Sequence, residues 1–246
     1  TVFIFHGYFD HVGLYGHLIK HCLENNLAVV AYDLPGHGLS SGRATAIKSF
    51  DDYQWALQSC IGLCKGNVAE PCYGIGQSTG GAVLIDHFLD RTQQASEPFF
   101  KKGVLLAPLV RPMGWKGALL LHSAVGPFVS TWKRVFSVNS NDPEFIKFLK
   151  THDPLQSQIM SIEWISALRK WIKEIENTAS IDGRILIIQG QRDMTVDWRH
   201  NISVLQQKFS DVDVRYLSKG RHHLVNESED IRQEVFGLID AELALS

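Results

Sequence analysis

The sequence predicts an α/β protein with a doubly wound, mostly parallel sheet that carries helices on both faces. Short apolar runs alternate along the chain with segments of helical periodicity, and this alternation is typical of such folds. The runs are nearly continuous in apolar residues, as expected for strands that are covered on both faces. The chain has 246 residues, of which 45% are hydrophobic and 20% are charged. This length allows one large domain or two small ones, and the composition is ordinary for a globular protein.

Six apolar runs are predicted to form the strands of this sheet. The predicted strands span 2–5, 27–32, 72–75, 104–107, 185–189 and 212–217. Apolar residues spaced three and four apart indicate the helices between them. The predicted helices span 15–23, 50–64, 79–89, 164–175 and 196–209, and a last helix begins near 228. Strands and helices therefore alternate at both ends of the chain.

One stretch interrupts the alternation. Between 111 and 175 the sequence contains helical patterns but no run that is typical of a strand. We therefore predict an α/β core made of residues 1–110 and 176–246, with residues 111–175 inserted as a helical cap, or lid. The insertion lies between the predicted strands 104–107 and 185–189. It should therefore lie above the carboxyl ends of the strands, where α/β sheets bind their ligands.

Composition and charge exclude several classes of function. With 24 basic and 26 acidic residues, the formal charge is −2, which gives no reason to expect a nucleic-acid partner. No apolar run approaches the length of about 18 residues that a membrane span requires. Cysteines occur at Cys22, Cys60, Cys64 and Cys72, a spacing that fits neither a zinc knuckle nor a CxxC pair. We expect free thiols, no metal, no cofactor and, because no signal peptide is visible, a cytoplasmic location.

The strongest local motif is Gly-Gln-Ser-Thr-Gly at 76–80. It follows a predicted strand and precedes a predicted helix, which is the context of a nucleophile elbow. In such an elbow the serine occupies a sharp turn, and the glycines two residues away on each side avoid clashes. The helix that follows favours the negative charge that develops during nucleophilic attack. We therefore predict that Ser78 is a nucleophile.

A serine nucleophile needs a base, and the base needs a carboxylate that orients it. In this strand–turn–helix setting, the order along the chain is serine, acid, histidine. Asp193 follows the fifth predicted strand, and His222 and His223 follow the sixth. Asp197 is the alternative acid, but Asp193 is closer to the strand end and is therefore favoured. The positions of His222 and His223 in the sequence do not decide which of them is the base.

An oxyanion hole needs two backbone N–H groups that point at the developing negative charge. One is expected from Thr79, the residue after the nucleophile. The other is expected from the loop after the first strand, which has the sequence His-Gly-Tyr-Phe at 6–9. Gly7 permits a close approach of the backbone there, and Tyr8 is the predicted donor.

Five motifs support a more specific interpretation. They are His-Gly at 6–7, DLPGHGLS at 33–40, GQSTG at 76–80, GQRD at 190–193 and RHHLVNE at 221–227. Together they resemble the α/β-hydrolase superfamily, and more narrowly its serine-aminopeptidase-like branch of monoacylglycerol lipases and lysophospholipases. In that branch the base precedes a short x-Leu-x-x-Glu stretch, so the resemblance implies that His222 is the base and that the insertion is a lid over the active site. Gln77 departs from the branch, where histidine is common, and we expect this departure to leave the catalytic groups untouched.

The insertion is rich in aromatic side chains, which predicts an apolar pocket beneath the lid. Burying each methylene of an acyl chain contributes about 0.8 kcal/mol, so such a surface suits a fatty or aromatic ester. The predicted substrate-binding residues are Trp115, Phe128, Trp132 and Trp164. We predict hydrolysis of a small ester or lipid, monoacylglycerol-like or lysophospholipid-like, with transient contact between the lid and a membrane surface.

Other activities remain open, because a fold does not choose among substrates. An aminopeptidase would need carboxylates that bind a free amino group, and Asp142, Glu144 and Asp153 are the candidates. A thioesterase, an acyltransferase and a non-catalytic ligand receptor are the further alternatives. The complete set of serine, acid and histidine argues against the receptor.

Overall fold

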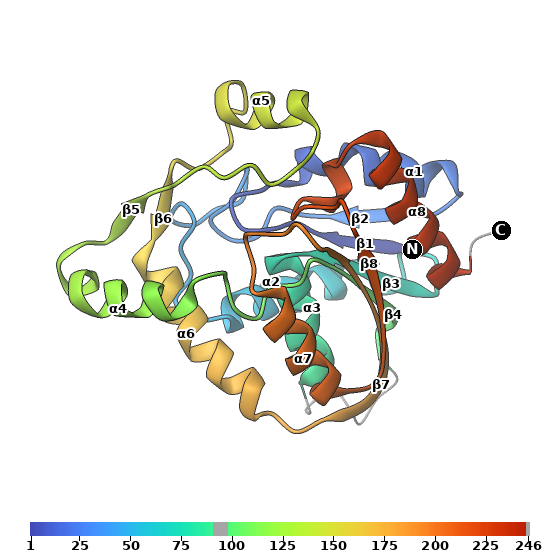
Figure 1. The fold of residues 1–246 in the computed structure, drawn as a ribbon. Helices are drawn as coiled ribbons and strands as arrows, with labels where there is room; N and C mark the ends of the chain where they lie inside the picture. Colours follow the sequence, from blue (N-terminus) through green and yellow to red (C-terminus); the bar gives the residue numbers. More distant parts are fainter. Residues whose placement is uncertain (91–97, 245–246) are drawn as a thin grey trace.

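The computed structural model describes residues 1–90 and 98–244 of the chain. Its centre is a six-stranded parallel sheet in the order β2-β1-β3-β4-β7-β8 (Figure 1). The strands are β1 Val2–Phe5, β2 Val29–Ala31, β3 Cys72–Gln77, β4 Phe100–Leu106, β7 Ile181–Gly190 and β8 Phe209–Leu217. Because every pairing is parallel, the six carboxyl ends lie along one edge. The predicted fold class is confirmed.

Helices cover both faces of this sheet (Figure 1). One face carries α1 Gly16–Glu24, the turn η1 Val12–Tyr15 before it, and α8 Glu229–Leu243, while the other carries α2 Asp51–Cys64, α3 Thr79–Leu89 and α7 Trp198–Lys208. Alternate strand residues face the two layers. In β1, Phe3 and Phe5 pack with α2 and α3, whereas Val2 and Ile4 pack with α1 and α8. This double burial explains why the strands are continuous apolar runs.

Several strands begin earlier than their apolar runs predict. Lys101 and Lys102 belong to β4, and Asp182 belongs to β7. Lys101 and Asp182 are exposed, so at these amino ends the apolar pattern is lost although the backbone still pairs. The pattern therefore locates the centre of each strand but not its first residues. The edge strand β2 is shorter than predicted, and its residues are only half-buried.

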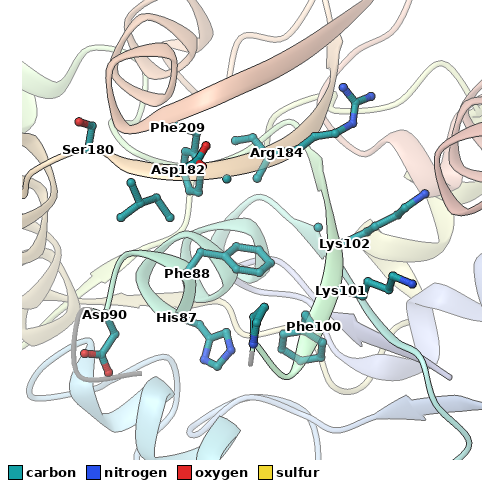
Figure 2. A pocket seen from close by; sticks show the side chains of 15 residues that line it. His87, Phe88, Asp90, Phe100, Lys101, Lys102, Ser180, Asp182, Arg184 and Phe209 are labelled. Carbon is teal, nitrogen blue, oxygen red and sulfur yellow. The ribbon is translucent and has the colours of Figure 1, made fainter. Parts of the chain in front are cut away.

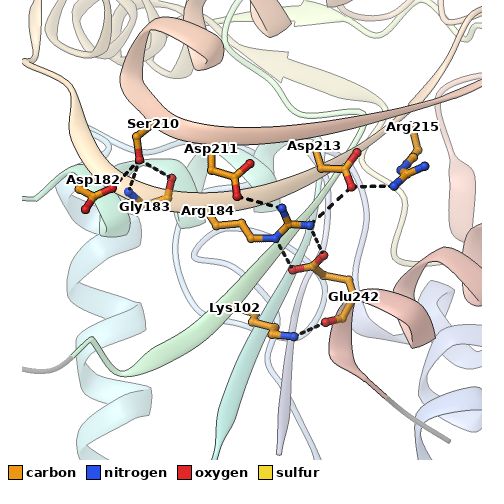
Figure 3. A network of polar contacts seen from close by, with 9 residues as sticks. All are labelled: Lys102, Asp182, Gly183, Arg184, Ser210, Asp211, Asp213, Arg215 and Glu242. Carbon is orange, nitrogen blue, oxygen red and sulfur yellow. Dashed lines mark hydrogen bonds and ion pairs between the residues drawn. The ribbon is translucent and has the colours of Figure 1, made fainter.

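Charged side chains form a network at this amino end of the sheet (Figure 3). At its centre is the Arg184 guanidinium on β7. It pairs with Asp211 at 2.9 Å, with Asp213 at 3.5 Å and with Glu242 at 2.9 Å. Lys102 donates to the backbone carbonyl of Glu242. Through Glu242 the network connects the end of α8 to β4 and β7. Its exposed ion pairs each contribute only about 0–1 kcal/mol.

Between β4 and β7 the chain leaves the sheet. This insertion contains α4 Trp115–Val125, η3 Gly126–Phe128, β5 Thr131–Lys133, α5 Pro143–Thr151, β6 Ile159–Ser161 and α6 Ile162–Asn177. The prediction that it contains no strand is wrong, because β5 and β6 pair antiparallel as a separate ribbon. Each strand has three residues, which are too few to show a period-two pattern. The role of the insertion as a lid stays a prediction.

The turn between β3 and α3 brings α3 into close contact with β1. A Cβ atom on Gly80 would lie 2.1 Å from the Phe5 carbonyl oxygen, and one on Gly76 would lie 2.4 Å from the Gly80 carbonyl oxygen. Real Cβ atoms do not approach backbone atoms so closely, so both positions require glycine. The two glycines around Ser78 are therefore a packing requirement of the fold.

We predict that Gly80→Ala destabilises the protein by about 1–3 kcal/mol or more, because the added methyl group must displace the backbone of β1. Gly237→Ala is the matched control. A Cβ at Gly237 meets nothing within 4 Å and the residue lies inside α8, so alanine should stabilise the protein by about 0.4–1 kcal/mol. Urea unfolding of both variants measures the difference. Equal stabilities would contradict the close packing of α3 on β1.

Candidate active site

Ser78 occupies the turn between β3 and α3 in a conformation that few residues adopt. Its φ of 53° and ψ of −111° lie outside the favoured regions of an L-residue. The Ser78 N–H donates to the Leu106 carbonyl on β4. The Ser78 carbonyl accepts from the N–H groups of Ala82 and Leu109. Such strain persists only where the surroundings fix the conformation, and it is common at functional sites.

The loop after β1 lies beside Ser78. A Cβ atom on Gly7 would lie 3.4 Å from the Cβ of Ser78, so the backbone of this loop comes close to the predicted nucleophile. Thr79 is the first residue of α3, where backbone N–H groups have no partner within the helix. The two segments predicted to form an oxyanion hole are therefore neighbours. The choice of Tyr8 and Thr79 as its donors stays a prediction.

The Tyr8 side chain connects this loop to the insertion. Its hydroxyl donates to the Thr45 carbonyl at 2.7 Å and accepts from the Ser161 N–H at 3.3 Å. Its ring stacks on the Trp164 indole, with the ring centroids 3.9 Å apart. Burial raises the pKa of the Tyr8 hydroxyl well above its ordinary value, so the hydroxyl stays protonated and keeps its donor role. These contacts fix the position of Tyr8 through its side chain.

Asp193 and His222 meet in the loops that follow β7 and β8. His222 Nδ1 lies 2.7 Å from Asp193 Oδ2, and both side chains are buried. The other Asp193 oxygen accepts from the N–H groups of Thr195 at 2.7 Å and Val196 at 3.2 Å. Gln189 Nε2 donates to Asp193 Oδ2 at 3.2 Å. These bonds fix the orientation of the carboxylate, which in turn orients the imidazole.

The burial of this pair changes the pKa values of both groups. Burial alone lowers the pKa of His222, but the charge of Asp193 and the hydrogen bond to it outweigh burial, and the pKa is raised above 6.5. Burial alone raises the pKa of Asp193, but the charge of His222 and the hydrogen bonds to the carboxylate lower it below 3.8. Asp193 therefore stays ionised and stabilises the protonated imidazole. A serine–histidine–aspartate triad requires this electrostatic arrangement.

Asp197, the alternative acid, has a structural role. It is the N-cap of α7, and its side chain accepts from the His200 N–H. Such caps satisfy N–H groups at a helix start that lack a partner within the helix, and they contribute about 1 kcal/mol. Asp193, by contrast, is bonded to His222. The geometry therefore favours Asp193 as the acid.

His223, the alternative base, belongs to a second buried network, which the sequence did not predict. Its Nε2 lies 3.0 Å from Asp10 Oδ2, and the Tyr15 hydroxyl donates to the same oxygen at 3.0 Å. Tyr15 in turn accepts from the Gly7 N–H at 3.0 Å. Burial alone raises the pKa of Asp10, but the charge of His223 and the hydrogen bond from it lower that pKa well below its usual range. His223 thus connects its own loop to the loop beside Ser78.

Residues 138–142 of the insertion, called the strap below, bind the backbone of residues 218–223, the loop after β8 that is called the histidine loop. The Asn139 carbonyl accepts from the N–H groups of His222 at 3.1 Å and His223 at 2.8 Å. The buried Glu227 carboxylate accepts from the Asn141 N–H of the strap at 2.6 Å and from the Arg221 N–H of the histidine loop at 2.5 Å. Part of the insertion therefore supports the candidate base directly.

Gln77, which was expected to leave the catalytic groups untouched, contacts the backbone of the candidate base. Gln77 is 1% exposed, and its Nε2 donates to the His222 carbonyl at 2.8 Å. The physical reason is topological. Gln77 is the last residue of β3, and the loop after β8 lies at the same edge of the parallel sheet. A residue next to the predicted nucleophile therefore reaches the backbone of the candidate base.

The four predicted substrate-binding residues differ in burial. Trp115 and Trp164 are buried, and the Trp164 indole donates to the Tyr53 hydroxyl at 3.1 Å. Trp132 is half-buried against the same core, whereas Phe128 is 84% exposed. Trp115 and Trp164 thus have clear packing roles. A role of any of the four in substrate binding stays a prediction.

Of the three carboxylates considered for an amino group, Asp142 and Asp153 make structural contacts, whereas Glu144 is exposed. Asp142 caps α5 and accepts from the Glu144 N–H at 2.9 Å. Asp153 pairs with His11 at 3.1 Å. Within residues 1–90 and 98–244, no group of three or more histidine, cysteine, aspartate or glutamate side chains is arranged to hold a metal ion.

A cavity of about 480 Å³ lies at the opposite end of the sheet (Figure 2). The amino-terminal residues of β4 and β7 line it, together with the aromatic rings of Phe88 and Phe209. Ser78 and Asp193, in contrast, follow the carboxyl ends of their strands. This cavity therefore does not belong to the candidate site.

Comparisons with known proteins identify relatives of the chain. Residues 1–229 match the serine aminopeptidase S33 family of hydrolases. The chain is 25% identical to a monoglyceride lipase homolog of monkeypox virus, over 97% of this chain and 87% of that protein. It is 31% identical to human monoglyceride lipase, over 44% of this chain and 35% of that protein.

Solved structures show the same fold. A monoacylglycerol lipase of Paleococcus ferrophilus superposes with a TM-score of 0.84 at 20% identity, over 100% of this chain and 94% of that one. A soluble variant of the Saccharomyces cerevisiae monoglyceride lipase, solved with a substrate analog, gives a TM-score of 0.83 at 16% identity, over 99% of this chain and 86% of that one.

We predict that His222→Ala lowers kcat for ester hydrolysis by about 10⁴-fold or more, as expected for loss of a triad member. His223→Ala should keep most of the activity, but it leaves the buried Asp10 carboxylate without its imidazole partner, which costs about 1–3 kcal/mol of stability. Steady-state kinetics and urea unfolding of both variants separate the two roles. A larger loss of activity in His223→Ala would reverse the assignment of the base.

We predict that kcat/KM falls at low pH with a kinetic pKa above 6.5, because the base must be neutral and Asp193 raises the pKa of His222. Asp193→Asn removes the charge that opposes burial, so its residual activity should decline at a lower pH than that of the wild type. Profiles of kcat/KM against pH for both proteins provide the test. A wild-type rate that stays flat from pH 4 to 8 rules out a histidine base.

Proposed function

The chain belongs to the serine aminopeptidase S33 family of hydrolases, and on that premise we propose that it is a serine ester hydrolase with Ser78 as nucleophile, His222 as base and Asp193 as acid. The observation that carries the proposal is the buried hydrogen bond of 2.7 Å between Asp193 and His222. It lies at the same edge of the sheet as the strained turn of Ser78. A buried charged pair of this kind at a ligand-binding edge favours a functional role.

In the proposed mechanism, Ser78 Oγ attacks the ester carbonyl while His222 Nε2 takes the hydroxyl proton. Asp193 holds the imidazole in the right tautomer and stabilises the imidazolium. The N–H groups of Tyr8 and Thr79 stabilise the oxyanion. His222 returns the proton to the leaving alcohol, and an acyl group remains on Ser78. Water activated by His222 then releases the acid.

We propose a lipid-like ester, monoacylglycerol-like or lysophospholipid-like, as the substrate. The relatives named as monoglyceride lipases support this class. The insertion also supports it, because its first part exposes apolar side chains. Leu120 of α4 is 75% exposed and Phe128 is 84% exposed. Such surface can bind an acyl chain, with about 0.8 kcal/mol for each buried methylene.

The same apolar surface supports the proposal that the lid touches a membrane surface transiently. Leu120, Leu121 and Phe128 are exposed close to one another in the sequence, and Lys116 and Lys133 flank them. Apolar side chains with flanking lysines suit the interface of a lipid layer. No helix in the described part of the chain is long and apolar enough to cross a membrane.

An aminopeptidase is the alternative that the name of the family raises. It would need several carboxylates that are free to bind an amino group, but Asp142 caps a helix and Asp153 pairs with His11, which leaves only the exposed Glu144. These contacts make the peptidase the weaker candidate. A thioesterase, an acyltransferase and a ligand receptor are distinguished by the substrates that the protein turns over.

The proposed function predicts an optimum of acyl-chain length. For p-nitrophenyl esters of two to sixteen carbons, kcat/KM should rise by up to about fourfold per methylene and stop when the pocket is full. Ser78→Ala should lose about 10⁴-fold or more of this activity while its unfolding is unchanged. Matched thioesters and amino-acid anilides test the alternatives. A preference for acetyl esters would overturn the lipid substrate, and full activity in Ser78→Ala would overturn the mechanism.

The role of the lid needs a variant that spares the strap. Replacing only residues 120–129 with a Gly-Ser linker removes the exposed apolar side chains, and it keeps the buried Trp115 and residues 138–142, which bind the histidine loop. We expect short esters to be hydrolysed at nearly the wild-type rate and the preference for long chains to be lost. An unchanged optimum of chain length would place the acyl site outside this part of the insertion.

A further inference from the structure

Gln77 connects the strand of the nucleophile to the loop of the base. It is the last residue of β3, directly before Ser78, and its side chain is buried. Its Nε2 donates to the His222 carbonyl at 2.8 Å, and its Oε1 accepts from the Leu224 N–H at 3.3 Å. The Gln77 carboxamide therefore binds two successive peptide groups, the one between His222 and His223 and the one between His223 and Leu224.

This pair of bonds requires a side chain that donates at one end and accepts at the other. The neutral amide of glutamine does both. Glutamate at this position would present no donor to the His222 carbonyl, and methionine would leave both peptide groups without their partner. The length also matters, because asparagine is one methylene shorter and cannot reach both groups from the same backbone position.

The opposite side of the same backbone is held by the strap. The Asn139 carbonyl accepts from the N–H groups of His222 and His223. Gln77 and Asn139 together therefore hydrogen-bond to the peptide groups on both sides of His222. Asp193 holds Nδ1 of the ring. With the backbone and one ring nitrogen fixed, the other ring nitrogen has a defined position. A displacement of about 1 Å in a reacting group can cost roughly 10²-fold in rate.

We propose that Gln77 is a positioning residue, which sets the place of His222 relative to Ser78 by tying the histidine loop to β3. The inference rests on the proposed function, because this placement affects a rate only if His222 takes the proton of Ser78. Gln77 acts through the backbone and does not touch the reacting atoms. Its loss should therefore lower kcat and leave KM nearly unchanged.

Gln77→Met tests this inference, because it keeps the length of the side chain and removes both hydrogen bonds. We expect kcat per folded molecule to fall about 10- to 100-fold, with KM within about threefold of the wild type. Gln54→Met is the matched control. Gln54 Nε2 also donates to a backbone carbonyl at 2.8 Å, that of Val83, but it joins α2 to α3 away from the histidine loop. Its kcat should stay within about twofold of the wild type.

The folded fraction of each variant is measured by circular dichroism during thermal unfolding. If Gln77→Met does not fold, Gln77→Asn takes its place, and its kcat should fall about tenfold. An unchanged kcat in the folded Gln77 variant overturns the inference, and so does an equal loss in Gln54→Met. Wild type and Ser78→Ala accompany every assay. Absent hydrolysis by the wild type, or full activity in Ser78→Ala, contradicts the proposed function. Unchanged Gln77 variants beside an inactive Ser78→Ala contradict this inference alone.

Discussion

The contact between the start of α3 and the end of β1 is the constraint on which the rest of the site depends. The Gly80 backbone lies so close to the Phe5 carbonyl that no side chain fits between them. This contact places the first turn of α3 beside the loop of Gly7, directly after the sharp turn of the chain at Ser78. Because the sheet is parallel, the loops after β7 and β8 lie at the same edge. The serine therefore lies at the same edge of the sheet as groups more than a hundred residues away.

Two buried carboxylate–imidazole pairs lie at this edge, and adjacent histidines supply them. His222 is bonded to Asp193, and His223 is bonded to Asp10. Burying a charge is costly unless a partner and further hydrogen bonds compensate it. Both aspartates have such compensation. Two backbone N–H groups donate to Asp193, and the Tyr15 hydroxyl donates to Asp10. The two pairs have separate tasks, because one orients the candidate base and the other joins the histidine loop to the loop of Gly7 beside Ser78.

The sequence predicted the features that depend on local pattern. Double burial produces continuous apolar strands, and a sharp turn between glycines has a recognisable spacing, so the sheet and the position of Ser78 could be predicted. Long-range polar contacts have no such pattern. The bond from Gln77 to His222 joins residues 145 positions apart, and that from His223 to Asp10 joins residues 213 apart. The ribbon of β5 and β6 was missed because three-residue strands show no periodicity.

The strap has a consequence for how the chain can be recombined. Residues 138–142 belong to the insertion by sequence, yet the Asn139 carbonyl and the Glu227 carboxylate join them to the histidine loop. A chimera that takes the whole segment 111–175 from a relative would exchange part of the support of the candidate base together with the apolar surface. The preference for a substrate and the turnover rate would then change together. A junction placed between β5 and the strap would exchange the surface of α4 and keep the contacts that hold the histidine loop.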